Sequence, residues 1–295
     1  MELLQLKYFQ IVAKHEHMTQ AAEELNISQP SLSKVINRLE EELGVLLFDR
    51  QGRNIRLNAF GRTFLGRVER IFRELEDGKK EITDMNGSEH GRISLAVTSL
   101  SLFSSILEGF VRKHPEVRFR QVISSTAEIR RQLEQGEIDL CITSPPIEGT
   151  GIACTPLITE EVFLAVPKGH RFAGRESIDL SEAAQEAFVS MKKGYGFRDI
   201  TDEFCRQAGF EPDVVFEGEV AGVLFNLINA GMGISFVPNP GIRGFSSQSP
   251  ELVRISNPIC RRTISLSYMK GHYLSNAAKE LCNYVILYFK NNETE

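Results

Sequence analysis

The stretch of sequence that decides the fold runs from Thr19 to Gly44 and reads TQAAEELNISQPSLSKVINRLEEELG. Its pattern predicts two short helices separated by a tight turn. Thr19 is placed to cap the first helix, because a threonine oxygen accepts a backbone N–H of the first turn. Ala21, Ala22 and Leu25 then supply one apolar face. The segment therefore predicts a helix-turn-helix.

The second helix of this segment follows the compact turn Asn26–Ser28. Ser28 is its predicted N-cap, and Pro30 suits the first turn because the N–H that proline lacks has no helical partner there. Gly44 is expected to end the helix. Its buried stripe is formed by Leu32, Val35, Ile36, Leu39 and Leu43.

The outward face of the second helix has the chemistry of DNA recognition. A helix-turn-helix places this helix in the major groove, where Gln pairs with adenine, Lys or Arg with guanine or phosphate, and Ser with either. The free N–H groups near Ser28 suit a phosphate oxygen. The polar residues facing outward are Gln29, Ser31, Ser33, Lys34, Asn37 and Arg38. A small helical domain with a merely hydrated polar face is the alternative interpretation, and Glu40–Glu42 should point away from a duplex.

Charge is distributed unevenly along the chain. Its formal net charge is −5, which by itself argues against nucleic acid. Local patches decide phosphate binding, however, and residues 50–73 are strongly basic. That stretch carries one carboxylate, Glu69, against Arg50, Arg53, Arg56, Arg62, Arg67, Arg70 and Arg73.

From residue 64 to residue 85 the apolar residues are spaced by threes and fours, which is the heptad seam of one long helix. So narrow a stripe needs a partner helix, most simply that of a second copy of the chain. The predicted dimerisation residues are Phe64, Val68, Ile71, Leu75, Ile82 and Met85.

Length and composition predict a soluble protein of several folded units. The chain has 295 residues, more than one ordinary core accommodates. The first residues lack the features of a signal peptide, and no apolar stretch is long enough for a bilayer, so a cytoplasmic location without membrane contact is expected. Five scattered cysteines without a C-x-x-C pair argue against disulfides and a zinc site. We expect neither a metal nor another cofactor.

After the predicted hinge at residues 86–91, strands and helices alternate, which predicts an α/β architecture with largely parallel sheets. Strands are expected at 93–97, 117–123, 138–143, 161–166, 214–217, 233–237 and 263–269. Helices are expected near 104–113, 127–135, after 196, at 220–230 and near 274–289, and residues 238–250 read as a surface connection.

The N-terminal sequence resembles that of LysR-type transcriptional regulators. The resemblance runs without a gap from about Leu6 to Gly61 and includes FQIVA at 9–13, TQAAEEL at 19–25, SQPSLS at 28–33, LEEELG at 39–44 and LFDR at 47–50. Looser matches continue through GEIDL at 136–140 and AGMGI at 230–234. His17 and residues 58–59 depart from the usual family pattern, which puts the local capping in doubt.

The resemblance implies an α+β protein with a winged helix-turn-helix at 1–58, a linker helix at 59–88 and an effector-binding domain at 89–295. The last is similar to type 2 periplasmic binding proteins, with lobe I at about 91–161 and 268–290 and lobe II at about 162–267. In the family, residues matching Gln29, Pro30, Ser33 and Lys34 meet the major groove. The residue matching Arg53, on the wing, enters the minor groove, whose negative potential suits an arginine. The full set of expected DNA contacts is Thr19, Ser28, Gln29, Pro30, Ser31, Ser33, Lys34, Asn37, Arg38, Arg50 and Arg53.

The effector site is expected between the lobes, at strand ends and helix N-termini, where hydroxyl groups suit a small carboxylate. Arg198 is either a carboxylate clamp or an exposed surface arginine. Each Ser or Thr has the alternative role of capping its own helix. The expected effector residues are Thr98, Ser99, Ser101, Ser124, Thr126, Thr143, Gly196, Arg198 and Val220.

The resemblance also implies the partners. Two chains are expected to pair through their linker helices and to bind an inverted-repeat promoter site on double-stranded DNA, as a homodimer or homotetramer. A small-molecule effector and RNA polymerase are the further expected partners, with activation or repression depending on where the site lies.

Three other interpretations remain at this point. An enzyme is disfavoured because the six histidines are dispersed and no catalytic motif appears. A thiol-based regulator would use Cys205, if the neighbouring Arg206 lowers the thiol pKa, whereas a buried structural thiol is the alternative. A regulator that answers only a protein partner is the third.

Overall fold

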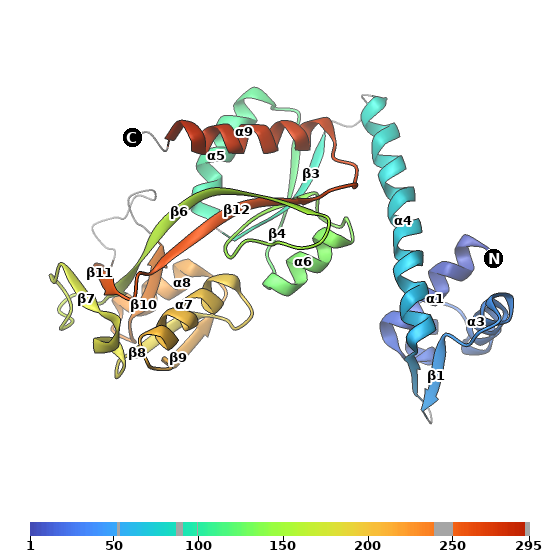
Figure 1. The fold of residues 1–295 in the computed structure, drawn as a ribbon, viewed down its shortest axis with the longest axis horizontal. Coiled ribbons are helices and arrows are strands. Elements are labelled where there is room, and N and C mark those ends of the chain that lie inside the picture. The colour runs from blue at the N-terminus through green and yellow to red at the C-terminus, as the bar shows by residue number, and fades with distance from the viewer. Residues whose placement is uncertain (52–53, 87–90, 99, 239–249, 293–295) are drawn as a thin grey trace. The chain divides into compact units, whose positions relative to one another are not determined.

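The chain divides into two compact units, Met1–Lys80 and Glu81–Glu295. The computed structural model describes residues 1–51, 54–86, 91–98, 100–238 and 250–292 (Figure 1). The expected surface connection at 238–250 lies almost wholly outside these residues. Each unit has its own buried apolar core. The division falls within the predicted linker helix, so this helix belongs partly to each unit.

The first unit is a winged helix-turn-helix, as predicted. It consists of α1 (Leu3–His15), α2 (Met18–Glu24), α3 (Gln29–Leu43), the hairpin β1 (Phe48–Gln51) and β2 (Asn54–Leu57), and most of α4 (Ala59–Met85). The strands pair antiparallel. Ser28 caps α3 as expected, since its side chain accepts the N–H of Ser31, and Gly44 ends α3 in the left-handed conformation. Local sequence therefore determines where α3 begins and ends.

The predicted cap of α2 is wrong. The helix begins at Met18, and its N-cap is His17, which has an extended backbone. The Gln20 N–H donates to His17 Nδ1 over 3.4 Å. Thr19 consequently lies inside the first turn, where its exposed side chain is not used for capping.

The acidic run at the end of α3 is only partly exposed. Glu40 is buried, and its Oε1 accepts the N–H groups of Leu47 (2.6 Å) and Phe48 (3.3 Å). On the other strand, the Leu57 N–H donates to Glu16 Oε1 over 2.8 Å. Because an unsatisfied buried N–H is costly, these carboxylates fix the hairpin against the helices.

The second unit has two lobes joined by long strands. β6 (Ile152–Val166) and β12 (Arg261–Met269) pair antiparallel and run side by side from one lobe into the other (Figure 1). The strand order of the main sheet is β4 (Arg118–Val122), β3 (Arg92–Val97), β5 (Leu140–Thr143), β12, β6, β11 (Glu251–Asn257) and β7 (Ser177–Asp179). The prediction of largely parallel sheets is therefore wrong, because the crossing strands make the sheet mixed. Some pairs within the lobes are parallel, such as β3 with β4 in one lobe and β8 (Ala187–Met191) with β9 (Asp213–Gly218) in the other.

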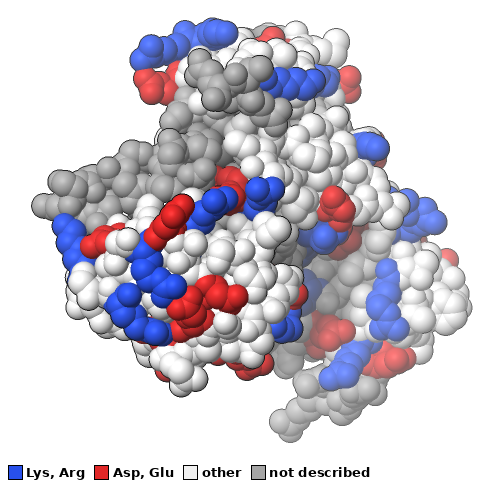
Figure 2. Space-filling model, turned by 60° about the vertical axis from the view of Figure 1, so that its left-hand side comes forward, with Lys and Arg blue, Asp and Glu red and all other residues white. Residues whose placement is uncertain are grey.

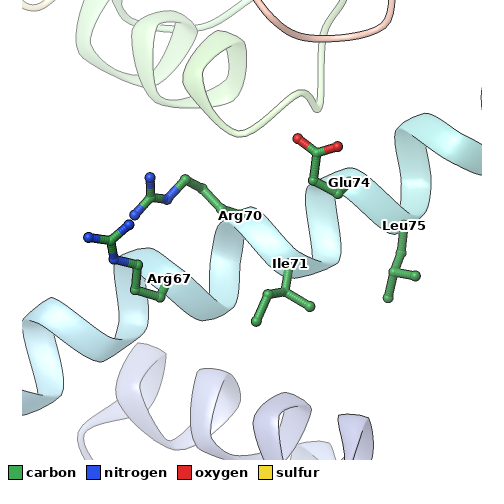
Figure 3. Close-up of a pocket in the computed structure, with 5 residues that line it drawn as sticks. All are labelled: Arg67, Arg70, Ile71, Glu74 and Leu75. Carbon is green, nitrogen blue, oxygen red and sulfur yellow. The ribbon is translucent and has the colours of Figure 1, made fainter.

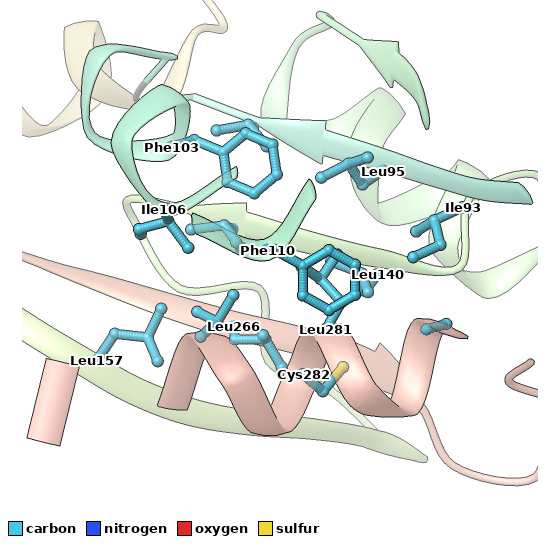
Figure 4. Close-up of a cluster of buried hydrophobic side chains, with 14 of the residues drawn as sticks. Ile93, Leu95, Phe103, Ile106, Phe110, Leu140, Leu157, Leu266, Leu281 and Cys282 are labelled. Carbon is cyan, nitrogen blue, oxygen red and sulfur yellow. The ribbon is translucent and has the colours of Figure 1, made fainter. Parts of the chain in front are cut away.

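Lobe I has β3 (Arg92–Val97), β4 (Arg118–Val122) and β5 (Leu140–Thr143), with the helices α5 (Leu100–Lys113), α6 (Thr126–Glu134) and α9 (Asn276–Asn292). Its main core lies between the sheet, α5 and α9, where Phe110, Leu140 and Leu281 are fully buried (Figure 4). The last turn of α4 is fixed to this lobe, since Tyr273 Oη (2.7 Å) and the Asn276 N–H (3.1 Å) both donate to Asp84 Oδ2. Asp84 thus caps the start of α9.

Lobe II has the strands β7 (Ser177–Asp179), β8 (Ala187–Met191), β9 (Asp213–Gly218), β10 (Ser235–Pro238) and β11 (Glu251–Asn257), and the helices α7 (Gly196–Gln207) and α8 (Ala221–Asn229). The sequence did not predict β7, β8 or β11. Three residues are too few for a periodic signal in β7, and β11 lies between β6 and β7, so its pairing depends on distant segments.

Candidate nucleic-acid and effector sites

The outward face of α3 is accessible as a DNA-reading surface. Gln29, Lys34 and Asn37 are exposed, whereas Ser33 is half-buried. Arg38 is also exposed, and its Nε lies 3.3 Å from Glu42 Oε1. This ion pair is too accessible to be strong, so the guanidinium can exchange its partner for a phosphate. Exposed side chains on one helical face match what major-groove binding requires.

The start of α3 combines a capped turn with exposed polar groups. Ser28 Oγ lies 2.7 Å from Ser31 Oγ and accepts the Ser31 N–H over 3.3 Å. Gln29 and Pro30 follow it on the surface. Arg53 and the side chain of Arg50 lie outside the described residues. Their predicted roles on the wing therefore stay predictions.

The predicted seam on α4 divides into two parts. Phe64 and Val68 pack in the core of the first unit, where the ring of Phe64 lies 5.3 Å from that of Phe9 and Val68 is fully buried. The expectation that Val68 pairs with a second chain is therefore wrong, because no surface of Val68 is accessible. The remaining seam residues are exposed; they are Ile71, Leu75, Ile82 and Met85.

The exposed part of the seam lies beside arginines. Ile71 and Leu75 project from one side of α4, whereas Arg70 and Glu74 project away from them (Figure 3). Met85 is 81% exposed and Ile82 69% exposed, which is unusual for large apolar side chains. A helix that shows such a stripe to water is suited to packing against another helix.

The predicted effector residues of the two lobes meet at one point. The N–H of Thr126, the first residue of α6, donates to the carbonyl oxygen of Gly194 in lobe II over 3.0 Å. A Cβ built on Gly196 would lie 2.6 Å from the Ser144 carbonyl oxygen and 3.0 Å from Thr126 Oγ1. Thr98 joins this cluster from the end of β3, because its Oγ1 accepts the Ser144 N–H over 3.2 Å.

Two helix N-termini converge at this junction. Ser125 caps α6 by accepting the N–H of Glu128 over 3.3 Å, whereas the N-cap of α7, Tyr195, makes no side-chain capping bond. Helix N-termini carry partial positive charge, and two of them facing one point favour an anion there. The junction therefore has the electrostatics of a carboxylate site.

Buried hydroxyl groups add hydrogen-bonding capacity beside the junction. Thr143 is 2% exposed and Ser144 1% exposed, and the hydroxyl oxygen of Ser144 has no hydrogen-bond partner among the described residues. The hydroxyl oxygen of Ser265, the cross-strand partner of Thr143 on β12, also lacks a partner among these residues. Because unsatisfied buried hydroxyls are uncommon, these groups fit a site that receives a polar ligand or water.

Arg198 is not the surface arginine that one alternative expected. It is 4% exposed, and its Nε donates to Asp202 Oδ1 (2.6 Å) while Nη1 donates to Glu217 Oε1 (2.9 Å) and to the Met191 carbonyl oxygen (3.0 Å). Burial opposes the charge, but the bonds to Asp202 and Glu217 raise the pKa of Arg198. Its bonds within lobe II leave the N-terminus of α7 as the better ligand group.

Two further predicted effector residues, Ser124 and Val220, take no part in the contacts described above. Ser124 is half-buried just before α6, and Val220 is 61% exposed at the start of α8, without a side-chain cap. Ser99 and the side chain of Ser101 lie outside the described residues.

A buried ion pair near the junction was not predicted from the sequence. Arg262 on β12 and Glu160 on β6 are cross-strand partners, and the Nε of Arg262 donates to Glu160 Oε1 over 2.7 Å. The Arg262 guanidinium also lies 4.9 Å from the ring of Phe197, in the first turn of α7. The two charges are about a hundred residues apart in sequence, so no local pattern pointed to them.

Comparison with known proteins gives the family. Residues 3–62 match the model of the bacterial regulatory helix-turn-helix protein, lysR family, and residues 86–288 match the LysR substrate binding domain. An uncharacterised HTH-type transcriptional regulator, YybE of Bacillus subtilis, is 38% identical over 292 residues, covering 98% of this chain and 99% of that protein.

The chain belongs to the LysR family. It is a DNA-binding transcriptional regulator with an effector-binding domain, and not an enzyme. Among solved structures, full-length OxyR C199D from Pseudomonas aeruginosa has a TM-score of 0.67 at 23% identity, covering 97% of this chain and 95% of its own. CbnR in complex with its target DNA has a TM-score of 0.62 at 24% identity, covering 97% of this chain and 99% of its own. Both likenesses confirm the fold.

In this LysR-family chain, the surroundings of Cys205 disfavour the thiolate. Cys205 is fully buried, and burial raises its pKa to about 12. Arg206 pairs with Glu203 instead of lowering that pKa, contrary to the expectation for a thiol sensor. Because the thiolate is the species that reacts with peroxide, Cys205 fits a structural role.

The surface charges of lobe II are largely paired. Arg171 lies 2.6 Å from Glu186, and Arg175 lies 2.7 Å from Glu182. On the face shown in Figure 2, basic and acidic side chains lie next to one another. That face therefore gives no reason to extend the DNA surface beyond the first unit.

Neither a membrane span nor a metal site is found among the described residues. No helix in that part of the chain is long and apolar enough to span a membrane. Nor do three or more His, Cys, Asp or Glu residues of that part gather into a group able to hold a metal ion.

Proposed function

We propose that this regulator binds inverted-repeat promoter sites as a homodimer or homotetramer and answers a small anionic effector held between its lobes. Its functional parts would be the winged helix-turn-helix at 1–58, the linker helix at 59–88 and the effector domain at 89–295. Within the last, lobe I takes about 91–161 and 268–290, and lobe II about 162–267. RNA polymerase is the proposed partner at the promoter, and the cytoplasm the proposed location.

The DNA-binding part of the proposal rests on the exposed face of α3. Its exposed side chains Gln29, Lys34 and Asn37 would meet base edges, and the N-terminus of α3 would meet a phosphate. The complete set of proposed DNA contacts is Thr19, Ser28, Gln29, Pro30, Ser31, Ser33, Lys34, Asn37, Arg38, Arg50 and Arg53. The exposed apolar stripe from Ile71 to Met85 supports pairing of two chains, which would present two such helices to an inverted repeat.

The effector part of the proposal rests on one observation, the convergence of the N-termini of α6 and α7 at Thr126 and Gly196. Thr98, Thr143 and Ser144 border that point and would bind the polar groups of the ligand. An anion held by both lobes would favour one lobe arrangement over the other. Such a difference is the condition for any ligand to shift a conformational equilibrium.

Selection of fragments from a pool of genomic DNA by the purified chain tests this function. We expect a small set of promoter fragments with an inverted repeat whose half-sites are about one helical turn, or multiples of it, apart. Genes beside those fragments then indicate the effector. Recovery of random fragments, together with a monomeric chain in solution, would contradict the proposal.

A further inference from the structure

The loop Lys192–Gly196, here called the strap, reaches from lobe II to lobe I. Its Gly194 carbonyl oxygen accepts the N–H of Thr126 over 3.0 Å. A Cβ built on Gly194 would lie 3.7 Å from Ser125 Cβ. Gly196, at the other end of the strap, is buried against Ser144, Pro145 and Thr126. The two lobes are therefore in contact along the strap.

The strap is held firmly by its own lobe. The Lys192 N–H donates to the Gly218 carbonyl oxygen over 3.0 Å, and the Tyr195 N–H donates to the Lys192 carbonyl oxygen over 3.2 Å. Lys192 Nζ also forms an ion pair with Glu219 at 2.9 Å. Gly194 has a φ of +87°, a conformation natural to glycine, which directs its carbonyl group toward α6. These bonds fix the shape of the strap without the help of lobe I.

We propose that the strap is an internal competitor of the effector. Its Gly194 carbonyl oxygen occupies the Thr126 N–H, the donor at the N-terminus of α6 that an effector carboxylate would otherwise use. This inference rests on the proposed effector site. An ionised carboxylate binds a backbone N–H roughly twice as strongly as a neutral carbonyl group does, so an anion displaces the strap. Displacement frees lobe II from lobe I at this point, and the lobes take a different angle.

Two features identify the strap as a gate and not merely a close contact. A side chain at position 196 has no room, because even a Cβ would lie 2.6 Å from the Ser144 carbonyl oxygen. The donor it covers belongs to the first residue of a helix, where the N–H has no helical partner. The strap therefore supplies the partner that this N–H requires while no anion is bound.

Disulfide trapping in the full-length chain tests the proposal. The Cβ separation of 3.7 Å between positions 125 and 194 falls within the range of disulfide bonds. We expect the double variant Ser125→Cys/Gly194→Cys to cross-link rapidly under a mild oxidant, as measured by non-reducing mass spectrometry. The control Ser125→Cys/Gly222→Cys should not cross-link, because a Cβ at Gly222, on α8, has nothing within 4 Å.

Sodium acetate is the carboxylate probe, compared with sodium chloride at the same pH and ionic strength. We expect saturating acetate to slow cross-linking at least about tenfold. This corresponds to a hydrogen bond that stabilises the displaced strap by about 1.4 kcal/mol. Cross-linking at equal rates in acetate and chloride would overturn the proposal.

Gly196→Ala, introduced into the Ser125→Cys/Gly194→Cys chain, gives an independent measurement. Its added methyl group should wedge the lobes apart and slow cross-linking, whereas Gly222→Ala should leave the rate unchanged. Equal rates for both would count against the strap. A second variant, Thr126→Pro, removes the N–H at a helix position that tolerates proline, and we expect it to abolish the effect of acetate.

These results separate the strap from the proposed function. A chain that selects no promoter but shows acetate-sensitive cross-linking contradicts the DNA-binding proposal alone. A chain that binds its promoter but cross-links independently of acetate contradicts the strap and leaves the DNA-binding proposal standing.

Discussion

The two units encode their sites in different ways. In the first, the proposed DNA-reading residues lie on one helix, α3, whose cap, apolar stripe and terminal glycine are contiguous in sequence. In the second, the proposed effector site is assembled from Thr98, Thr126, Ser144 and the strap, which come from four separate segments. A recognition helix can be recognised locally, whereas an effector site between lobes depends on topology.

The largest expected effect tests whether the two units are independently stable. Phe9 is fully buried in the first unit and packs on the rings of Phe48 and Phe64. Phe9→Ala should destabilise that unit by about 3–5 kcal/mol, the usual loss for a buried phenylalanine. Differential scanning calorimetry should show the transition of the first unit at a lower temperature and that of the second unit unchanged.

Phe60→Ala is the matched control, since Phe60 is 61% exposed and should change either transition little. A single transition that shifts as a whole in Phe9→Ala would show that the units unfold together. The two units would then not be independently stable.

The next prediction concerns base reading by α3. Lys34→Ala should weaken binding to a selected promoter by about 1–3 kcal/mol if Lys34 contacts a base, and binding to random duplex much less. Electrophoretic mobility shifts on both duplexes measure the difference. Lys14→Ala is the control, because Lys14 is exposed on α1 and pairs with Glu24. A uniform loss on both duplexes would assign Lys34 to phosphate instead.

A smaller effect is expected where α4 meets lobe I. Asp84 accepts hydrogen bonds from the Asn276 N–H and from Tyr273, so Asp84→Ala removes a cap from α9 and should cost about 1 kcal/mol of stability. Chemical denaturation of the second unit measures it. Tyr273→Phe removes one bond and keeps the cap, so it should cost less. Equal losses of stability in both variants would show that the Tyr273 hydroxyl group, and not the cap, provides the stabilisation.

The smallest effect is expected at Cys205. Its pKa of about 12 leaves almost no thiolate near neutral pH, so Cys205→Ala should not alter the response of DNA binding to peroxide. Iodoacetamide should modify the partly exposed Cys154 before Cys205 in the native chain. Rapid labelling of Cys205 at neutral pH would revive a thiol-based mechanism.

The contrast between the units also explains what the sequence could predict. Ser28, Pro30 and Gly44 act through neighbours a few residues away, so the bounds of α3 followed from local chemistry. The predicted cap of α2 was wrong because the N-cap is a histidine, His17, and not an ordinary capping residue. Val68 was assigned to a partner because a heptad pattern does not tell which core an apolar side chain enters.

In the second unit, the candidate residues Thr98, Thr126 and Gly196 were predicted, but the way in which they meet was not. Their meeting depends on β6 and β12, whose antiparallel pairing joins residues about a hundred positions apart. Gly194 gave no signal at all, because its role lies in a carbonyl group that every residue possesses. Backbone contacts of this kind cannot be recognised from residue type.

If α3 reads a specific DNA sequence, two dissociation constants must differ widely. Fluorescence anisotropy at physiological salt gives the affinity of the full chain for a selected promoter and for random duplex of equal length. We expect a preference of at least about 10³ for the promoter, as for other specific DNA-binding proteins. Equal affinity for the two duplexes would contradict sequence-specific reading by α3.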